Sequence, residues 1–143
     1  MRAVWYDRQG PASEVLQVGE VPDPEPGPGE VRVRVSRSGV NPGDTKKRRE
    51  WPGSSMAFPR VIPHSDGAGV IDSTGLGVEP KRVGQRVWIY GAQSYRPFGT
   101  AAEFTVVPGS QAIELPGSVS DDLGACLGIP GITAHRAVFG DDP

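Results

Sequence analysis

The chain has 143 residues, 36% of them hydrophobic, and a formal net charge of −2 at pH 7, which suits one domain with its own core. This charge gives no electrostatic basis for binding nucleic acid. No apolar run is long enough to span a bilayer and the N-terminus lacks a signal-peptide core, so we expect a cytoplasmic protein with no membrane partner. The single cysteine, Cys126, excludes an intrachain disulfide and a multi-cysteine zinc lobe.

The 20 glycines and 15 prolines are spread between short apolar runs, which is typical of turn-rich β structure. Runs of β-branched and aromatic residues predict strands over 3–6, 15–21, 31–36, 69–73, 83–90, 99–107 and 112–115. In the third run Val31, Val33 and Val35 alternate with polar residues, so one face of that strand is expected to be buried. Short strands at steady spacing imply an α+β, mainly β fold built on a twisted antiparallel barrel.

Short helices are predicted in three places. Asn41 or Asp44 is placed to cap a helix that runs through Lys46 to Glu50. Ser120, followed by two aspartates, predicts the N-cap of a second helix. Residues 131–139 predict a third helix near the C-terminus.

The stretch Lys46–Arg49 is the only dense basic run in the chain. Four charges on one helical turn favour water, so a solvated helix face is one interpretation. The other is that the helix lies beside an active cleft and that its positive charge, with Lys46 at the start, attracts the phosphates of a cofactor.

Two turn-rich polar segments, 41–44 and 62–71, stand out as candidate functional regions. In the second, Pro63 stiffens the start of the turn, and Gly67 and Gly69 leave backbone uncovered by side chains just before an apolar strand. Bare backbone beside a cluster of polar side chains suits close approach of a ligand. A tight turn with a bulge leading into the strand is the alternative.

The two segments, with a third one further along the chain, carry a family resemblance. In order, Asn41-Pro42-Gly43-Asp44, His64-Ser65-Asp66-Gly67-Ala68-Gly69-Val70 and Gly128-Ile129-Pro130-Gly131-Ile132-Thr133-Ala134 resemble the quinone oxidoreductase branch (zeta-crystallin type) of the medium-chain dehydrogenase/reductase superfamily. The resemblance covers nearly the whole chain, but only the N-terminal catalytic domain of that family. It implies that residues 1–143 form a GroES-like barrel with a linking helix at about 131–139. It also implies that a Rossmann cofactor domain is missing through truncation and that the full-length protein is a homodimer.

The same motifs bear on metal content. In the zinc alcohol dehydrogenases of this superfamily three residues hold the catalytic metal, and the motifs place Asn41, Ser65 and Ile129 at those positions. An amide, a hydroxyl and a hydrocarbon do not replace thiolates and imidazole, so we expect no zinc. Without a Lewis acid the hydride acceptor must itself spread the developing charge, as quinones and conjugated carbonyls do. The resemblance therefore implies hydride transfer from NADPH to a quinone or an activated double bond.

Single residues receive candidate roles, Asn41 and Thr133 from the resemblance, and His64 and Lys46 from their own chemistry at positions where the chain departs from the family pattern. The candidate catalytic residues are Asn41, Asp44, His64 and Asp66, and the candidate cofactor contacts are Asn41, Lys46 and Thr133. Asn41 would orient nicotinamide or substrate through its amide, and Thr133 would lie near the nicotinamide end of the cleft. Asp66 is either an acceptor that organises the turn or an Asx turn closing on nearby backbone. His64 stands where the branch commonly has glycine, and is either a proton donor to reduced substrate or a structural turn residue.

Two other functions stay open at this point. One is a stand-alone GroES-like binding module without catalysis, and the other is a zincless enoyl reductase that acts on thioesters. In the quinone reductase case the active site lies between two domains, so we expect the 143-residue chain by itself to be inactive.

Overall fold

The computed structural model describes residues 1–53 and 55–140. The strands in this part are β1 (Arg2–Trp5), β2 (Gln17–Glu20), β3 (Glu30–Gly39), β4 (Asp66–Thr74), β5 (Arg86–Ile89), β6 (Phe104–Pro108) and β7 (Ala112–Glu114). The helices are α1 (Ala12–Val15), α2 (Pro42–Arg48), α3 (Asp121–Gly124) and α4 (Ile132–Phe139), with shorter or irregular turns η1 (Pro80–Arg82), η2 (Gly109–Gln111) and η3 (Leu127–Gly131). All the ladders between these strands are antiparallel, which confirms the predicted mainly β fold with short helices.

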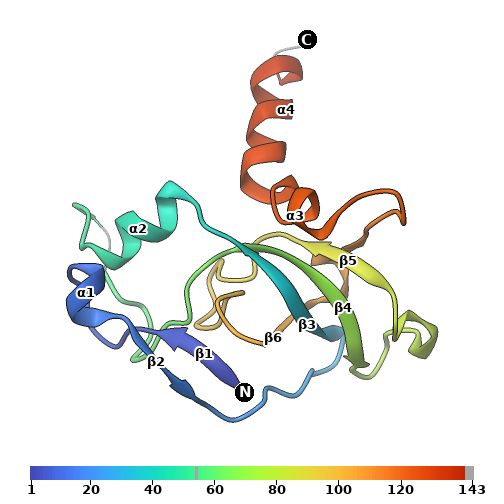
Figure 1. Cartoon of the computed structure of the whole chain (residues 1–143), viewed down its shortest axis with the longest axis horizontal. Coiled ribbons are helices and arrows are strands. Elements are labelled where there is room, and N and C mark those ends of the chain that lie inside the picture. The colour runs from blue at the N-terminus through green and yellow to red at the C-terminus, as the bar shows by residue number, and fades with distance from the viewer. Residues whose placement is uncertain (54, 141–143) are drawn as a thin grey trace.

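The strands form two sheets. β1 and β2 make a two-stranded sheet, and the others make a five-stranded sheet in the order β6-β3-β4-β5-β7. The long strands β3 and β4 run side by side across the middle (Figure 1). Isolated bridges from Ala3 to Ala102 and from Tyr6 to Val61 connect β1 to the chain that flanks the larger sheet.

The main core lies on one face of the five-stranded sheet. Its buried members come from β3, β4, β5, β6 and β7 and the loop after β5: Val31, Val33, Ile71, Val87, Ile89, Ala92, Val107 and Ala112. The alternation predicted for β3 is confirmed at Val31 and Val33, which are fully buried. Val35 is only half-buried, because the register with β4 shifts between Val35 and Arg37 and changes the direction of the strand there.

Two predicted strands are shorter than expected because local turns occupy their ends. Val15 was predicted to begin a strand, but it ends α1, since its N–H donates to the carbonyl of Pro11 at 3.1 Å and β2 begins only at Gln17. The strand predicted from residue 83 begins at Arg86, because η1 and the left-handed Gly84 (φ 89°) come first.

The predicted strand over 99–107 also divides into two parts. Its ladder with β3 starts at Phe104. The N–H groups of Gly99, Thr100 and Ala101 instead donate to the carbonyls of residues 62–64 at 2.8 to 3.1 Å. This hydrogen bonding fixes the backbone of the second polar segment against residues 99–101.

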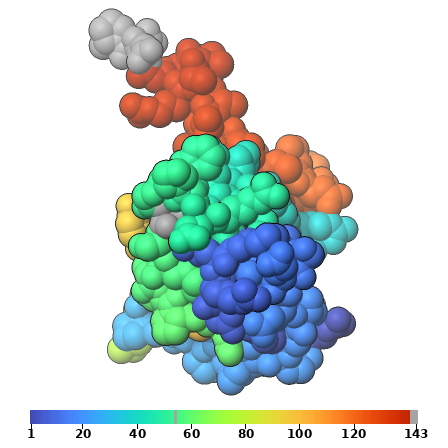
Figure 2. Space-filling view, turned by 90° about the vertical axis from the view of Figure 1, so that its left-hand side faces the viewer, coloured from blue at the N-terminus to red at the C-terminus, as the bar shows by residue number. Residues whose placement is uncertain are grey.

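The C-terminal part begins with α3, where the predicted cap is confirmed: the Oγ of Ser120 accepts from the N–H of Leu123 at 3.2 Å. The linking helix is present as α4, which projects away from the body of the molecule (Figures 1 and 2). Its residues Val138 and Phe139 are 72% and 61% exposed. Within residues 1–53 and 55–140, no helix combines the length and apolar character that crossing a membrane requires.

Candidate functional site

The two predicted polar segments lie next to each other because β3 and β4 are paired. Gly39, the last residue of β3, is opposite Asp66, the first residue of β4. Asn41 follows as the N-cap of α2, as predicted. A side chain at position 39 would collide with the carbonyl of Ala125, so glycine there allows the end of α3 to approach the start of β4. The strand pairing thus brings Asn41 and Asp66 together.

The side chain of Asp66 connects all three motifs. Asp66 is fully buried, and its Oδ2 accepts from the Nδ2 of Asn41 at 2.8 Å and from the N–H of Ile129 at 2.7 Å. Its Oδ1 has no partner within the described part of the chain and lies against Gly128, where a methyl group would overlap it. Segments that lie 25 and 63 residues apart from Asp66 in the sequence therefore meet on one carboxylate oxygen.

Asn41 is held from both its backbone and its side chain. Asp44, in the first turn of α2, accepts from the backbone N–H of Asn41 at 2.8 Å, while Asp66 accepts from the side chain. Burial raises the pKa of Asp44 above its ordinary value. Burial also raises the pKa of Asp66, and the hydrogen bonds from Asn41 and Ile129 oppose that rise. Both carboxyls thus orient Asn41 by hydrogen bonds made inside the protein.

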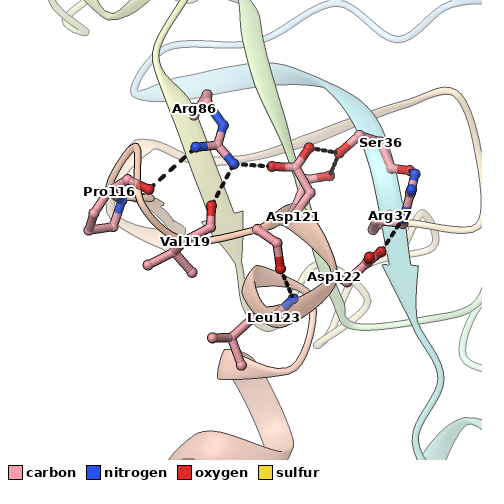
Figure 3. Close-up of polar contacts among 10 residues, drawn as sticks. Ser36, Arg37, Arg86, Pro116, Val119, Asp121, Asp122 and Leu123 are labelled. Atoms are coloured by element: carbon pink, nitrogen blue, oxygen red, sulfur yellow. Dashed lines mark hydrogen bonds and ion pairs between the residues drawn. The ribbon is translucent and has the colours of Figure 1, made fainter.

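A polar cluster outside the site holds α3 against the sheet (Figure 3). Asp121 accepts from the Oγ of Ser36 on β3 at 2.6 Å and from the guanidinium of Arg86 on β5. Arg86 also donates to two carbonyls in the loop before α3, those of Pro116 and Val119. α3 leads into η3, so this cluster positions the backbone that donates to Asp66.

Replacing Asp121 by asparagine is expected to lower the free energy of unfolding by about 1 kcal/mol at neutral pH, because two charge-assisted hydrogen bonds weaken. The hydrogen bond from Ser36 and the Arg86 guanidinium hold the pKa of Asp121 below its ordinary value. The contribution is therefore present above the pKa of the unfolded carboxyl and is lost as pH falls through the folded pKa. Urea unfolding at several pH values should show the difference from wild type shrinking in acid. The control is Asp122→Asn, since in the described part of the chain that exposed neighbour forms one ion pair, with the exposed Arg37; equal losses at both positions would contradict the prediction.

His64 belongs to a different set of hydrogen bonds. It is half-buried, and its Nδ1 lies 2.8 Å from the Oγ of Ser38. Its backbone is left-handed (φ 76°), the conformation that glycine adopts most easily, which agrees with the glycine common at this place in the resembling family. Burial lowers the pKa of His64, and the charge of Asp44 opposes that change.

The predicted cofactor contacts lie on exposed parts of two helices. Lys46 is exposed on α2, with its ammonium 4.9 Å from the centre of the Trp51 ring, and Thr133 is exposed on α4. The solvated-face interpretation of the basic run is wrong for Arg48, which is buried and donates to the carbonyl of Gly10. Lys47 is also engaged, through a 2.9 Å hydrogen bond to Gln93.

Two cavities lie near these residues, and some of their polar members, Ser38 and Thr100 among them, had not been indicated by the sequence. One, of about 470 Å³, is lined by Ser38, His64 and Thr100 together with apolar residues of β1 and β2. The other, of about 430 Å³, is lined by Tyr6, Lys47 and the loop residues Phe58, Gln93 and Tyr95. Thr100 was missed because it lies in a stretch that was interpreted only as strand, and Ser38 because it lies between the predicted strand over 31–36 and the polar segment at 41–44. The N–H of Ile129 was missed because a backbone donor has no side-chain signature.

The resemblance implies a nicotinamide nucleotide and no zinc, and the side chains of the described residues bear on both. Within residues 1–53 and 55–140, no three His, Cys, Asp or Glu side chains lie close enough to hold a metal ion. The amide of Asn41, the hydroxyl of Thr133 and the ammonium of Lys46 are donors suited to a carboxamide and to phosphates, so the residues present fit a nicotinamide nucleotide.

The sequence matches the family described as "Alcohol dehydrogenase GroES-like domain" over residues 27–117. Quinone oxidoreductase from Rattus norvegicus is 37% identical over 141 residues, which covers 97% of this chain and 41% of that protein. The chain therefore spans about 41% of the length of this curated relative.

Solved structures with the same fold include a quinone oxidoreductase and a protein complexed with NADPH. A quinone oxidoreductase from Pseudomonas syringae pv. Tomato DC3000 has a TM-score of 0.86 and 28% identity, covering 96% of this chain and 40% of that one. A mycobacterial protein complexed with NADPH has a TM-score of 0.83 and 27% identity, covering 100% of this chain and 41% of that one.

Proposed function

Because the chain belongs to the alcohol dehydrogenase GroES-like domain family, as its motifs predicted, we propose that it is the catalytic domain of an NADPH-dependent reductase. The proposed substrates are quinones and other conjugated carbonyls or activated alkenes, reduced by hydride transfer without zinc. The relatives named as quinone oxidoreductases and the neighbour complexed with NADPH support this choice. In the full-length protein we propose a following Rossmann domain and a homodimer.

The observation that carries the proposal is the hydrogen bonding around Asp66. Asn41 and Ile129 stand at two of the three positions that the resemblance aligns with zinc ligands. Both donate N–H groups to Asp66, and neither carries the thiolate or imidazole that zinc takes from proteins. This arrangement supports a reaction whose substrate spreads the developing charge over its own conjugated system.

The residues of this chain have definite tasks in that reaction. When bound, NADPH supplies the hydride. Asn41, held by Asp44 and Asp66, presents a rigid amide that orients the nicotinamide or the substrate carbonyl. Thr133 and Lys46 contact the cofactor from α4 and α2. His64 supplies the proton that the reduced substrate takes up.

Replacing Asn41 by alanine in the full-length protein is expected to lower kcat/KM for quinone-dependent NADPH oxidation by about 10-fold to 100-fold, because an orienting group is lost. The 143-residue chain by itself sets the baseline and is expected to show little or no turnover. The control is Gln17→Ala, which removes an exposed amide on β2 whose side chain, within the described residues, bonds to Asp7 and to none of the candidate site residues. Unchanged turnover in a folded Asn41→Ala protein would remove Asn41 from the site. Turnover with enoyl thioesters but not with quinones would change the substrate class.

A further inference from the structure

Two side chains, those of Ser38 and Thr100, connect His64 to the backbone at Asp66. The Nδ1 of His64 lies 2.8 Å from the Oγ of Ser38, and the Oγ of Ser38 lies 2.8 Å from the Oγ1 of Thr100. The Oγ1 of Thr100 donates to the carbonyl of Asp66 at 2.6 Å. The chain of contacts therefore runs from an imidazole through two hydroxyls to a carbonyl that accepts hydrogen bonds only.

Counting protons along this chain determines the form of the imidazole. The carbonyl of Asp66 has no proton, so the single hydroxyl proton of Thr100 is used there. The contact between the hydroxyls then requires the proton of Ser38, which leaves Ser38 only its lone pairs for His64. The third contact is a hydrogen bond only if the Nδ1 of His64 carries a proton.

We propose that Ser38 and Thr100 are positioning residues that hold His64 with a proton on Nδ1, so that His64 exchanges protons only through Nε2. The use of that proton rests on the proposed function. A quinone that has received one hydride needs one proton to become a hydroquinone, and imidazolium Nε2–H supplies it. The neutral imidazole that results keeps its proton on Nδ1. The hydroxyl groups of Ser38 and Thr100 therefore keep their orientation during the transfer. Water returns the proton to Nε2 afterwards.

The backbone at His64 is an independent reason to assign its side chain a task. A left-handed conformation is uncommon outside glycine, and it persists here because the surrounding backbone holds it. The carbonyl of His64 accepts from the N–H of Thr100, and the preceding carbonyl, of Pro63, accepts from the N–H of Ala101. A strained backbone that carries an ordered imidazole is typical of functional sites.

The charged groups around His64 come from two sides. Asp44 and Arg48 on α2 line the smaller cavity of about 130 Å³ beside the ring, and Arg2 and Glu103 line the larger cavity on the side of Ser38. Asp44 favours the imidazolium, while burial disfavours it more strongly and lowers the pKa of His64. The imidazolium of His64 therefore gives up its Nε2 proton more readily than an ordinary imidazolium does.

The tautomer can be measured directly, since the chain has only two histidines, His64 and the exposed His135. The 15N signals of the histidine-labelled protein are recorded at a pH where His64 is neutral. We expect His64 to be a single tautomer, with Nδ1 protonated and Nε2 unprotonated. His135, exposed on α4 beside the ring of Phe139, provides an internal comparison, and His135→Gln assigns the signals. A neutral His64 with its proton on Nε2 in the wild type would overturn the proposal.

Two substitutions test the chain of hydroxyls. Thr100→Val frees the Ser38 proton to be donated to Nδ1, so the 15N signals of His64 should move toward the Nε2–H form, and Ser38→Ala should give a mixture. The matched control is Thr105→Val, because the hydroxyl of Thr105 is equally buried and has no partner within the described chain. Unchanged His64 signals in a folded Thr100→Val protein would overturn the proposal.

The same variants separate the positioning from its proposed use. In the full-length enzyme, Thr100→Val is expected to lower kcat by about 10-fold and to displace its pH profile, while Thr105→Val leaves both unchanged. If the 15N signals respond as expected but the pH profile of kcat does not move, the positioning is upheld and the role of His64 as proton donor is rejected.

Discussion

Asp66→Val is expected to lower the free energy of unfolding by about 3 kcal/mol, because one buried and one part-buried donor lose their acceptor without gaining another. Valine is close in size to aspartate, so the loss reports hydrogen bonding more than packing. The donors are the Nδ2 of Asn41 and the N–H of Ile129, which both bond to Oδ2. Urea unfolding followed by tryptophan fluorescence measures the change.

The companion substitution Asp66→Asn removes the charge of the carboxylate but keeps a hydrogen-bond acceptor, so it separates the two contributions to stability. Asparagine keeps a carbonyl oxygen for both donors, so it should cost clearly less than valine. Burial raises the folded pKa of Asp66 above its unfolded value, so the contribution of this carboxyl is fully present below the unfolded pKa. That contribution is lost as pH rises through the folded pKa.

Asp66→Asn does not titrate, so its stability relative to wild type should improve as pH rises through that window. The raised pKa of Asp44 affects both proteins and cancels in the comparison. Equal stability of the valine variant and the wild type would show that the two donors find other partners.

Gly128→Ala is expected to lower the free energy of unfolding by about 3 kcal/mol through overpacking. The new methyl would overlap the Oδ1 of Asp66, a fully buried atom that has no room to move away. The matched control in the same segment is Gly131→Ala, where the added methyl would meet the carbonyl of Cys126 at 3.4 Å and the side chain of Leu127 at 3.9 Å, both ordinary contacts. That variant should change stability by less than about 1 kcal/mol.

A double substitution identifies the cause of the loss at position 128. With Asp66→Ala in the background the carboxylate is gone, so Gly128→Ala should cost much less than it does alone. If the two losses simply add, the overlap with Asp66 is not the cause. In that case the unusual backbone angle at Gly128 (ψ −112°) would carry the effect.

Several features could be predicted from neighbouring residues alone. The buried face of β3 follows from alternating valines, and the start of α3 follows from a serine cap with two aspartates behind it. The cap at Asn41 was also predicted, because its partner Asp44 is only three residues away. The membership in the GroES-like domain family followed from three motifs in the right order.

Features that depend on distant partners could not be predicted in this way. The helix ending at Val15 replaced a predicted strand because burying Val15 beside Tyr6 and Val61 outweighed the β preference of valine. Arg48 was expected in solvent, yet it is buried because the carbonyl of Gly10 lies within its reach.

The sequence by itself determined the class of fold, the family and the residue types available for chemistry, because these depend on local pattern and on motif order. Only the tertiary structure decided which groups meet. Asp66 bonds to a backbone N–H 63 residues away, and Ser38 reaches Thr100 across 62 residues. Such contacts depend on strand pairing and on backbone donors that have no sequence signature, so the bonding around Asp66 and the proton position on His64 appear only in the folded chain.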